Sequence, residues 1–294
     1  MKETFIDANF RGATLDIIQL CNDTIEAFQA QGFKLTLRQL YYQLVSRNVI
    51  PNQERAYKNL GSTISKARLA GLVDWSAIED RMRQPYKIGE WSDPDEIMRV
   101  VARQYRLQRW STQAELVEVW CEKDALAGVL RPIVDEWNAT LMVNRGYSSQ
   151  SAMKEAAERI GRSGKPVHIL YVGDLDPSGE DMVRDVFDRL SLLTRGNVDL
   201  DIVKLAITEA QVAEYNPPPN PAKMTDSRAR GFVERFGHNS YEADALPPDV
   251  LARTVRDGIE QWVDRVAWET TLAREANDRR LLTAAAERIM DERE

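Results

Sequence analysis

The sequence predicts an α/β protein: an N-terminal helical module is followed by a parallel sheet domain, and helices end the chain. From Glu115, short apolar runs alternate with helical stretches, which is typical of a Rossmann-like parallel sheet with right-handed crossovers. Apolar residues at helical spacing in residues 14–70 predict the N-terminal helices. We therefore expect two domains, at residues 1–90 and 91–294.

Three helices are predicted in the N-terminal module. The first covers Thr14–Ala30, the second begins after Thr36, and the third covers Asn52–Ala70. Thr36 and Gln39 form a capping-box pattern. The second helix is expected to bury one stripe of residues, Leu37, Leu40, Tyr41 and Leu44. Three short helices of which the last is basic are typical of a helix-turn-helix or winged-helix module that binds DNA.

The remaining elements follow from the same patterns. A short helix is expected at Trp75–Arg83, a linker at Gln84–Asp93, and a helix from Pro94 to about Trp110. Strands are predicted at 115–121, 139–144, 166–173 and 198–207, with helices at about 124–137, 150–162 and 178–193. Ser240–Ala245 is expected to be a further strand, and one or two long helices are expected from Pro247 onward.

Composition narrows the class of protein. Apolar residues make up 43% and charged residues 29% of the 294 residues, as in a globular protein. No signal-peptide pattern and no apolar run of membrane length is present, so we expect a cytoplasmic, nucleoid-associated protein without a membrane partner. Two cysteines and two histidines are too few for a disulfide framework or a zinc site.

The charge is distributed unevenly. The net charge is −7, which argues against a general nucleic-acid coat. Residues 34–72, however, carry seven basic side chains against a single acid, Glu54. A local basic patch of this kind is what binding to a phosphate backbone requires, although it also fits an ordinary solvated helix face.

Carboxylates follow two of the predicted strands. Asp174 and Asp176 come after the strand at 166–173, and Glu122 comes after the strand at 115–121. Ligands bind at the carboxyl ends of parallel strands, and carboxylate oxygens are preferred by hard cations such as Mg2+. Two other interpretations stay open. The aspartates could cap the next helix, or they could form the first half of an EF-hand loop, whose twelfth position would be Asp185.

These motifs resemble a known family. Glu122 with the Asp-x-Asp-Pro-x-Gly of residues 174–179 resembles the Toprim domain, in the form found in the A subunit of topoisomerase VI and the related meiotic double-strand-break transesterase. The resemblance implies a Mg2+ site, with Mn2+ as a substitute, made by Glu122, Asp174 and Asp176. Residues 36–42 resemble the family's Arg-x-x-Tyr/Phe-Tyr motif in a winged-helix domain. It implies that Tyr42 attacks DNA beside Arg38 and that Tyr41 packs.

The resemblance implies a type IIB-like topoisomerase A subunit that cuts double-stranded DNA by transesterification. Tyr42, Arg38 and Glu122 are the expected catalytic residues. The expected DNA contacts are Arg38, Arg47, Lys58, Lys66, Arg68 and Lys123. The expected partners are a second copy of the chain, whose metal site meets the tyrosine of the first, and a GHKL-type ATPase B subunit on another chain.

Two other functions stay open. The chain could be a Toprim endonuclease in which metal-activated water attacks and Tyr42 is structural, or a DNA-binding or assembly protein that does not cut. Two weaker likenesses accompany the main motifs. Gly146 and Ser148 resemble a turn near the family's site, and Glu242 and Asp244 lie in a third family-like stretch that we expect to be a solvated strand edge.

Overall fold

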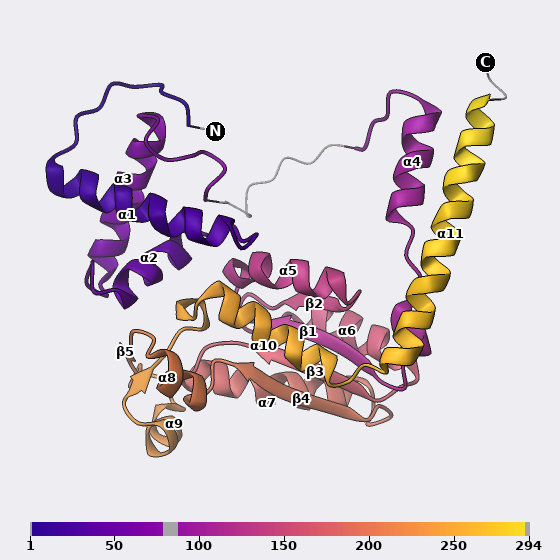
Figure 1. Cartoon of the computed structure of the whole chain (residues 1–294). Helices are drawn as coiled ribbons and strands as arrows, with labels where there is room; N and C mark the ends of the chain where they lie inside the picture. The colour runs from indigo at the N-terminus through magenta and orange to yellow at the C-terminus, as the bar shows by residue number, and fades with distance from the viewer. Residues whose placement is uncertain (1, 79–87, 292–294) are drawn as a thin grey trace.

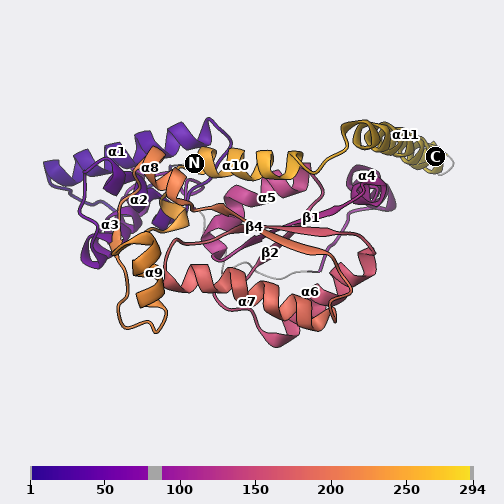
Figure 2. The same ribbon diagram turned by 90° about the horizontal axis from the view of Figure 1, so that it is seen from below.

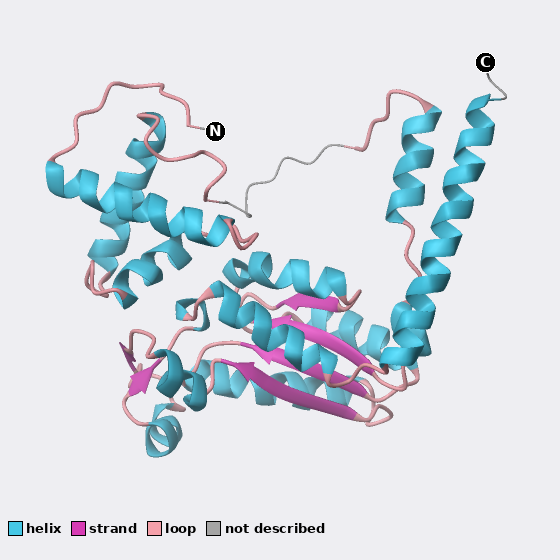
Figure 3. Ribbon diagram, viewed as in Figure 1, coloured by secondary structure: helices cyan, strands magenta, loops and turns pink. Residues whose placement is uncertain are grey.

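The computed structural model describes residues 2–78 and 88–291. Its central element is a four-stranded parallel sheet (Figure 3), which confirms the predicted α/β class. The strands are β1 (Leu116–Cys121), β2 (Thr140–Val143), β3 (Val167–Val172) and β4 (Leu200–Ala206). They lie in the order β2-β1-β3-β4, and each neighbouring pair is parallel.

Helices cover both faces of the sheet (Figure 2). On one face lie α5 (Ala127–Glu136) and α10 (Pro248–Glu260), and on the other lie α6 (Gln150–Ser163) and α7 (Pro177–Leu193). Alternate side chains of β1 and β3 enter two separate cores: Val119 and Leu170 pack with α5 and α10, whereas Trp120 and Tyr171 pack with α6 and α7. β1 and β3 are mostly apolar because both of their faces are buried, and the buried Glu118 of β1 is paired with Arg159 at 2.8 Å.

The N-terminal module is a bundle of three helices, α1 (Gly12–Gln29), α2 (Leu37–Ser46) and α3 (Glu54–Leu69). The capping box of Thr36 and Gln39 is present at the start of α2. The helices bury their own core, to which Ala245 of the sheet domain is added. In the described part of this module, β pairing is limited to single bridges, including one between Thr4 and Ala70, so wing strands are not seen.

Two further helices form an arm that projects from the sheet domain (Figure 1). α4 (Pro94–Gln104) packs along α11 (Arg265–Asp291). Glu275 of α11 is buried and binds the Arg109 guanidinium at 2.9 and 3.1 Å. The predicted helix from Pro94 ends early, because the backbone of Tyr105 leaves the helical region, with a ψ of 127°. None of the described helices is long and apolar enough to cross a membrane.

The predicted strand at Ser240–Ala245 is wrong. Only Asn239–Ser240 (β6) is a strand, paired with Asn220–Pro221 (β5), and Ala243–Ala245 forms a 3-10 turn. This turn lies between the sheet and α2. The other short elements are η1 (Arg109–Thr112), η2 (Asp124–Leu126), α8 (Glu209–Tyr215) and α9 (Ala229–Phe236). Residues 79–87, which include more than half of the predicted helix at 75–83 and the start of the predicted linker at 84–93, lie outside the described residues, so the boundary between domains at residue 90 stays a prediction.

Candidate functional site

The candidate site begins where β1 and β3 end side by side. Cys121 is opposite Val172, so the chain delivers Glu122 and Asp174 to the same edge of the sheet. The backbone N–H of Asp174 donates to Glu122 Oε2 at 3.0 Å, and both side chains are buried. A side chain at Gly173 would place its Cβ 2.6 Å from the Tyr171 ring and 3.0 Å from Glu122 Oε2. Glycine therefore permits the close approach of these two strand ends.

Asp176 has a different position from Asp174. Its Oδ1 accepts a hydrogen bond from the Gly179 N–H at 2.6 Å and caps α7. A Cβ on Gly179 would lie 2.3 Å from the Asp174 carbonyl oxygen, which explains the glycine. The capping interpretation is thus correct for Asp176. The EF-hand interpretation is wrong, because a strand enters the loop and Asp185 lies on α7, paired with Arg189 at 3.1 Å.

The Lys123 ammonium group is surrounded by carboxylates. Its Nζ lies 2.7 Å from Asp174 Oδ2, 2.9 Å from Glu242 Oε2 and 3.4 Å from Asp244 Oδ1. The Asp244 side chain is completely buried, so the expectation of a solvated edge at Glu242 and Asp244 is wrong. Burial raises the pKa of Asp174 and of Asp244, and the nearby ammonium opposes that rise. The turn at Ala243–Ala245 is aimed inward because Asp174 Oδ1 accepts from the Ala243 N–H at 2.9 Å.

Arg38 connects α2 to this cluster. Its guanidinium forms ion pairs with Glu242 and, at 2.8 Å, with Asp244 Oδ2. The same guanidinium lies 3.4 Å from the Tyr42 hydroxyl. We call the five charged side chains that meet here, Arg38, Lys123, Asp174, Glu242 and Asp244, the inter-domain cluster.

Tyr42 is buried, with 3% of its surface exposed. Burial, followed by a hydrogen bond to Glu242, raises the pKa of its hydroxyl, and Arg38 acts in the opposite direction. The neighbouring Tyr41 packs in the module core as expected, and its hydroxyl accepts from the Gln53 N–H at 2.8 Å. The predicted flank shared by Arg38 and Tyr42 is confirmed, but the phenol faces the sheet domain and not solvent.

The donor set tests whether a divalent cation fits. Glu122, Asp174 and Asp176 offer only carboxylate oxygens, which is the chemistry that Mg2+ prefers. Their arrangement is less complete: in the described residues no group of three or more acidic, histidine or cysteine side chains is gathered to hold a metal ion. The Lys123 ammonium lies on Asp174, and Asp176 caps a helix. The donor atoms are thus of the kind that Mg2+ prefers, but in this arrangement they are not gathered around one point, and the Lys123 ammonium supplies the positive charge beside Asp174.

The predicted DNA contacts divide into two groups. Lys58, Lys66 and Arg47 have exposed side chains on the module surface. Arg68 instead donates to the carbonyl oxygens of Trp75 and Ile78, at 2.9 and 2.6 Å. Arg38 and Lys123, as described above, lie in the inter-domain cluster. The structure thus leaves three of the six predicted cations facing solvent.

Sequence reasoning missed two features at this edge of the sheet. Lys204 of β4 donates to the Asp174 carbonyl oxygen at 2.7 Å, and a lysine within an apolar strand was the available signal. Tyr147 lies between Gly146 and Ser148, and its hydroxyl donates to Asp181 at 2.6 Å. Gly146 has a φ of +87°, which favours glycine in this turn. Arg228 also binds Asp181, at 2.7 Å, and so links α9 to α7.

Comparisons with known proteins add no family assignment. No protein-family model matches this sequence, and no curated protein matches it. Function is therefore inferred from the geometry of the inter-domain cluster and from the motifs that meet there.

Proposed function

We propose that this chain binds double-stranded DNA and cuts it by Mg2+-dependent transesterification, with Tyr42 as the nucleophile, in the manner of a type IIB-like topoisomerase A subunit. One observation carries the proposal: Arg38 lies on the Tyr42 hydroxyl and on Glu242 and Asp244, which in turn share Lys123 with Asp174. Two motifs that are far apart in the sequence are thereby adjacent. A phenol beside a guanidinium and strand-end carboxylates is a set suited to phosphoryl transfer.

Each side chain has a role in the proposed reaction. The Tyr42 oxygen attacks phosphorus and its proton passes to water, because Tyr42 leaves its hydrogen-bond partner Glu242 when the domains separate. A phosphotyrosyl bond to the 5′ end forms as the bond to the 3′ oxygen breaks, and that oxygen takes up a proton from water. Arg38 holds the scissile phosphate and stabilises the phenolate. Glu122, Asp174 and Asp176 are the residues that would hold Mg2+, and the cation would supply positive charge to offset the negative charge of the phosphate.

The reaction requires the two domains to separate locally. A phenol with 3% of its surface exposed cannot reach a duplex, so α2 must move from the turn at Ala243–Ala245. A DNA phosphate competes with Glu242 and Asp244 for Arg38, which is the cation that joins α2 to the sheet domain. DNA binding thus favours the separated arrangement, and a cation bound at the strand ends would displace Lys123 from Asp174.

A homodimer with two sites and a GHKL-type ATPase partner stay part of the proposal. A double-strand break needs two cutting sites, so a second copy of the chain supplies the second. Tyr42 lies near the carboxylates of its own chain. A site shared between two subunits therefore requires the N-terminal module of each copy to leave its own sheet domain and meet that of the other copy.

A second candidate function is favoured by the burial of Tyr42. If the phenol stays between the domains, water becomes the nucleophile and the chain is a Toprim endonuclease. Burial and the hydrogen bond to Glu242, which raise the pKa of Tyr42, support this alternative, because a phenol with a raised pKa is a weaker nucleophile at neutral pH.

The test is cleavage of supercoiled DNA with Mg2+ or Mn2+, run with and without protease. Covalent cleavage predicts that linear and nicked DNA enter the gel fully only after protease treatment, and that Tyr42→Phe abolishes both. Asp174→Asn with Asp176→Asn should also stop cleavage while leaving the fold intact. Cleavage by Tyr42→Phe at the wild-type rate would replace our proposal with the endonuclease, and no cleavage under either metal would leave a DNA-binding or assembly protein.

A further inference from the structure

The solvent face of α3 carries a row of polar side chains without an internal role. The exposed residues of this helix are Glu54, Arg55, Lys58, Asn59, Ser62, Ser65 and Lys66. Glu54 is the single acid among them, and Lys58 neutralises it at 2.7 Å. In the described part of the chain, no hydrogen bond or ion pair holds the side chain of Arg55 or Asn59. The row is therefore net positive and free to bind an external acceptor.

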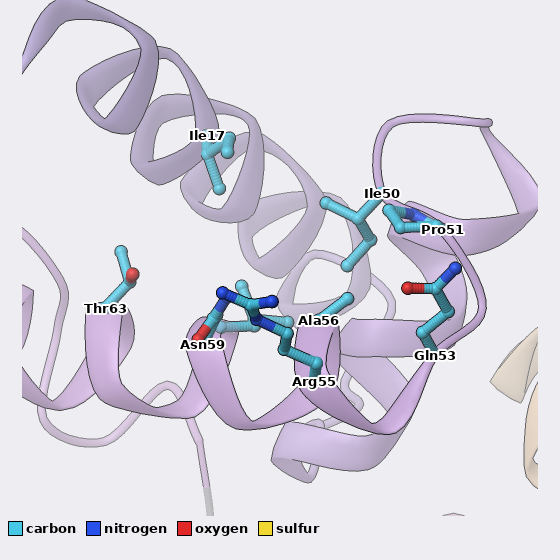
Figure 4. Close-up of a pocket in the computed structure, with 9 residues that line it drawn as sticks. Ile17, Ile50, Pro51, Gln53, Arg55, Ala56, Asn59 and Thr63 are labelled. Carbon is cyan, nitrogen blue, oxygen red and sulfur yellow. The ribbon is translucent and has the colours of Figure 1, made fainter.

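Two residues of this row, Arg55 and Asn59, also line a hollow beside α3. It has a volume of about 290 Å³ and lies between α3, α1 and the turn before α3. Figure 4 shows Arg55, Asn59 and Thr63 along α3, with Ile17 of α1 across the hollow and Ile50 at one end. Because α1 does not cover this flank of α3, a large partner such as a duplex can approach the side chains of Arg55 and Asn59.

We infer that Arg55 and Asn59 read base edges in the DNA major groove and give the protein a sequence preference. This inference rests on the proposed function for its ligand, double-stranded DNA, and adds specificity to it. In three-helix DNA-binding modules, the third helix enters the major groove and its N-terminal half contacts bases. Arg55 and Asn59 lie in the N-terminal half of α3, which begins at Glu54.

The chemistry of the two side chains defines the expected bases. A guanidinium donates two hydrogen bonds to O6 and N7 of guanine, and a carboxamide pairs with N6 and N7 of adenine. Residues at i and i+4 lie on one side of a helix about one turn apart, so the two contacts fall on nearby base pairs. Lys58 and Lys66, flexible point charges on the same face, suit phosphates, which position the protein without reading sequence.

The experiment is selection of bound duplexes from a library with a randomised centre, using the full-length protein without divalent metal so that binding is separated from cleavage. We expect the wild type to enrich a short motif that contains guanine and adenine. Arg55→Lys keeps the positive charge but removes the two parallel N–H donors of the guanidinium. The variant's preference for guanine should therefore fall about tenfold to hundredfold, while the salt dependence of its binding stays the same. Asn59→Ala should lose the preference for adenine alone.

Lys58→Ala is the matched control on the same helix face. It should retain the motif and bind more weakly, with a salt slope reduced by about 1. If the wild type binds DNA with no preference, or both variants keep the wild-type motif, the inference is overturned and the proposed cleavage stands. If the wild type enriches the motif but never cuts, the inference stands and the proposed function fails. If it binds no duplex, both fail.

Discussion

Arg38→Ala tests whether the inter-domain cluster holds the N-terminal module against the sheet domain. The substitution leaves Asp244, whose side chain is fully buried, with the Lys123 ammonium at 3.4 Å, and leaves Glu242 with the same lysine at 2.9 Å. Removing one partner of a buried ion pair costs about 3–5 kcal/mol. The Arg38 side chain is 40% exposed, and Lys123 remains, so we expect a loss of about 1–3 kcal/mol in the free energy of unfolding.

The assay is urea unfolding followed by tryptophan fluorescence. With a denaturant slope of about 3 kcal/mol/M, the midpoint should fall by about 0.3–1 M. Arg55→Ala removes an exposed arginine of the same module without an internal partner and should change stability by about 0.5 kcal/mol or less. In a double-mutant cycle, Asp244→Asn should couple to Arg38→Ala. Equal midpoints for the Arg38 and Arg55 variants, or no coupling with Asp244, would refute the inter-domain role of the arginine.

Three further predictions concern the carboxylates and the arm. Lys123→Met removes the ammonium from Asp174 and should tighten Mn2+ binding by about tenfold in calorimetry, because a competing positive charge is lost; unchanged or weaker binding would contradict the site. Gly179→Ala places a Cβ 2.3 Å from the Asp174 carbonyl oxygen. It should lower the free energy of unfolding by about 1–3 kcal/mol and weaken Mn2+ binding. Gly161→Ala is the control: its Cβ meets no atom within 4 Å, so it should neither lower stability nor weaken Mn2+ binding. Burial alone would raise the pKa of Glu275, but hydrogen bonds from Arg109 and from the backbone lower it. The ionised carboxylate therefore stabilises the fold fully above the unfolded pKa of about 4.3, and this stabilisation is lost as the pH falls. Glu275→Gln should lower the free energy of unfolding by about 3 kcal/mol at pH 7, and thermal melts should show a smaller difference from wild type at pH 3.

The sheet and most helices were predictable because local patterns determine them. β1 and β3 are mostly apolar runs buried on both faces, and within two residues of each strand end a carboxylate follows, Glu122 after β1 and Asp174 after β3. The capping box at Thr36 fixed the start of α2. Glu122 and Asp174 could be brought together from sequence because neighbouring parallel strands end at the same edge.

The inter-domain cluster was not predictable, because its contacts join distant parts of the chain. Residues 240–245 contain the alternation of a strand, but the turn at Ala243–Ala245 is set by the bond from the Ala243 N–H to Asp174 and by the pairing of Asp244 with Arg38. Tyr42 is buried in the module core, to which Ala245 is added, whereas its position on α2 predicted only a flank of the helix. Hydrophobic periodicity and short motifs describe neighbouring residues, so they cannot predict ion pairs between residues that are far apart in the chain.

The central claim is that the Tyr42 oxygen becomes covalently linked to DNA. The most direct measurement is mass spectrometry of the protein after cleavage in Mg2+, followed by digestion of the protein with protease and of the DNA with nuclease. We predict a nucleotide attached to the peptide that contains Tyr41 and Tyr42, with fragmentation placing it on Tyr42, and no such peptide from Tyr42→Phe. Cleaved DNA with no modified peptide, or a nucleotide on another residue, would contradict the claim.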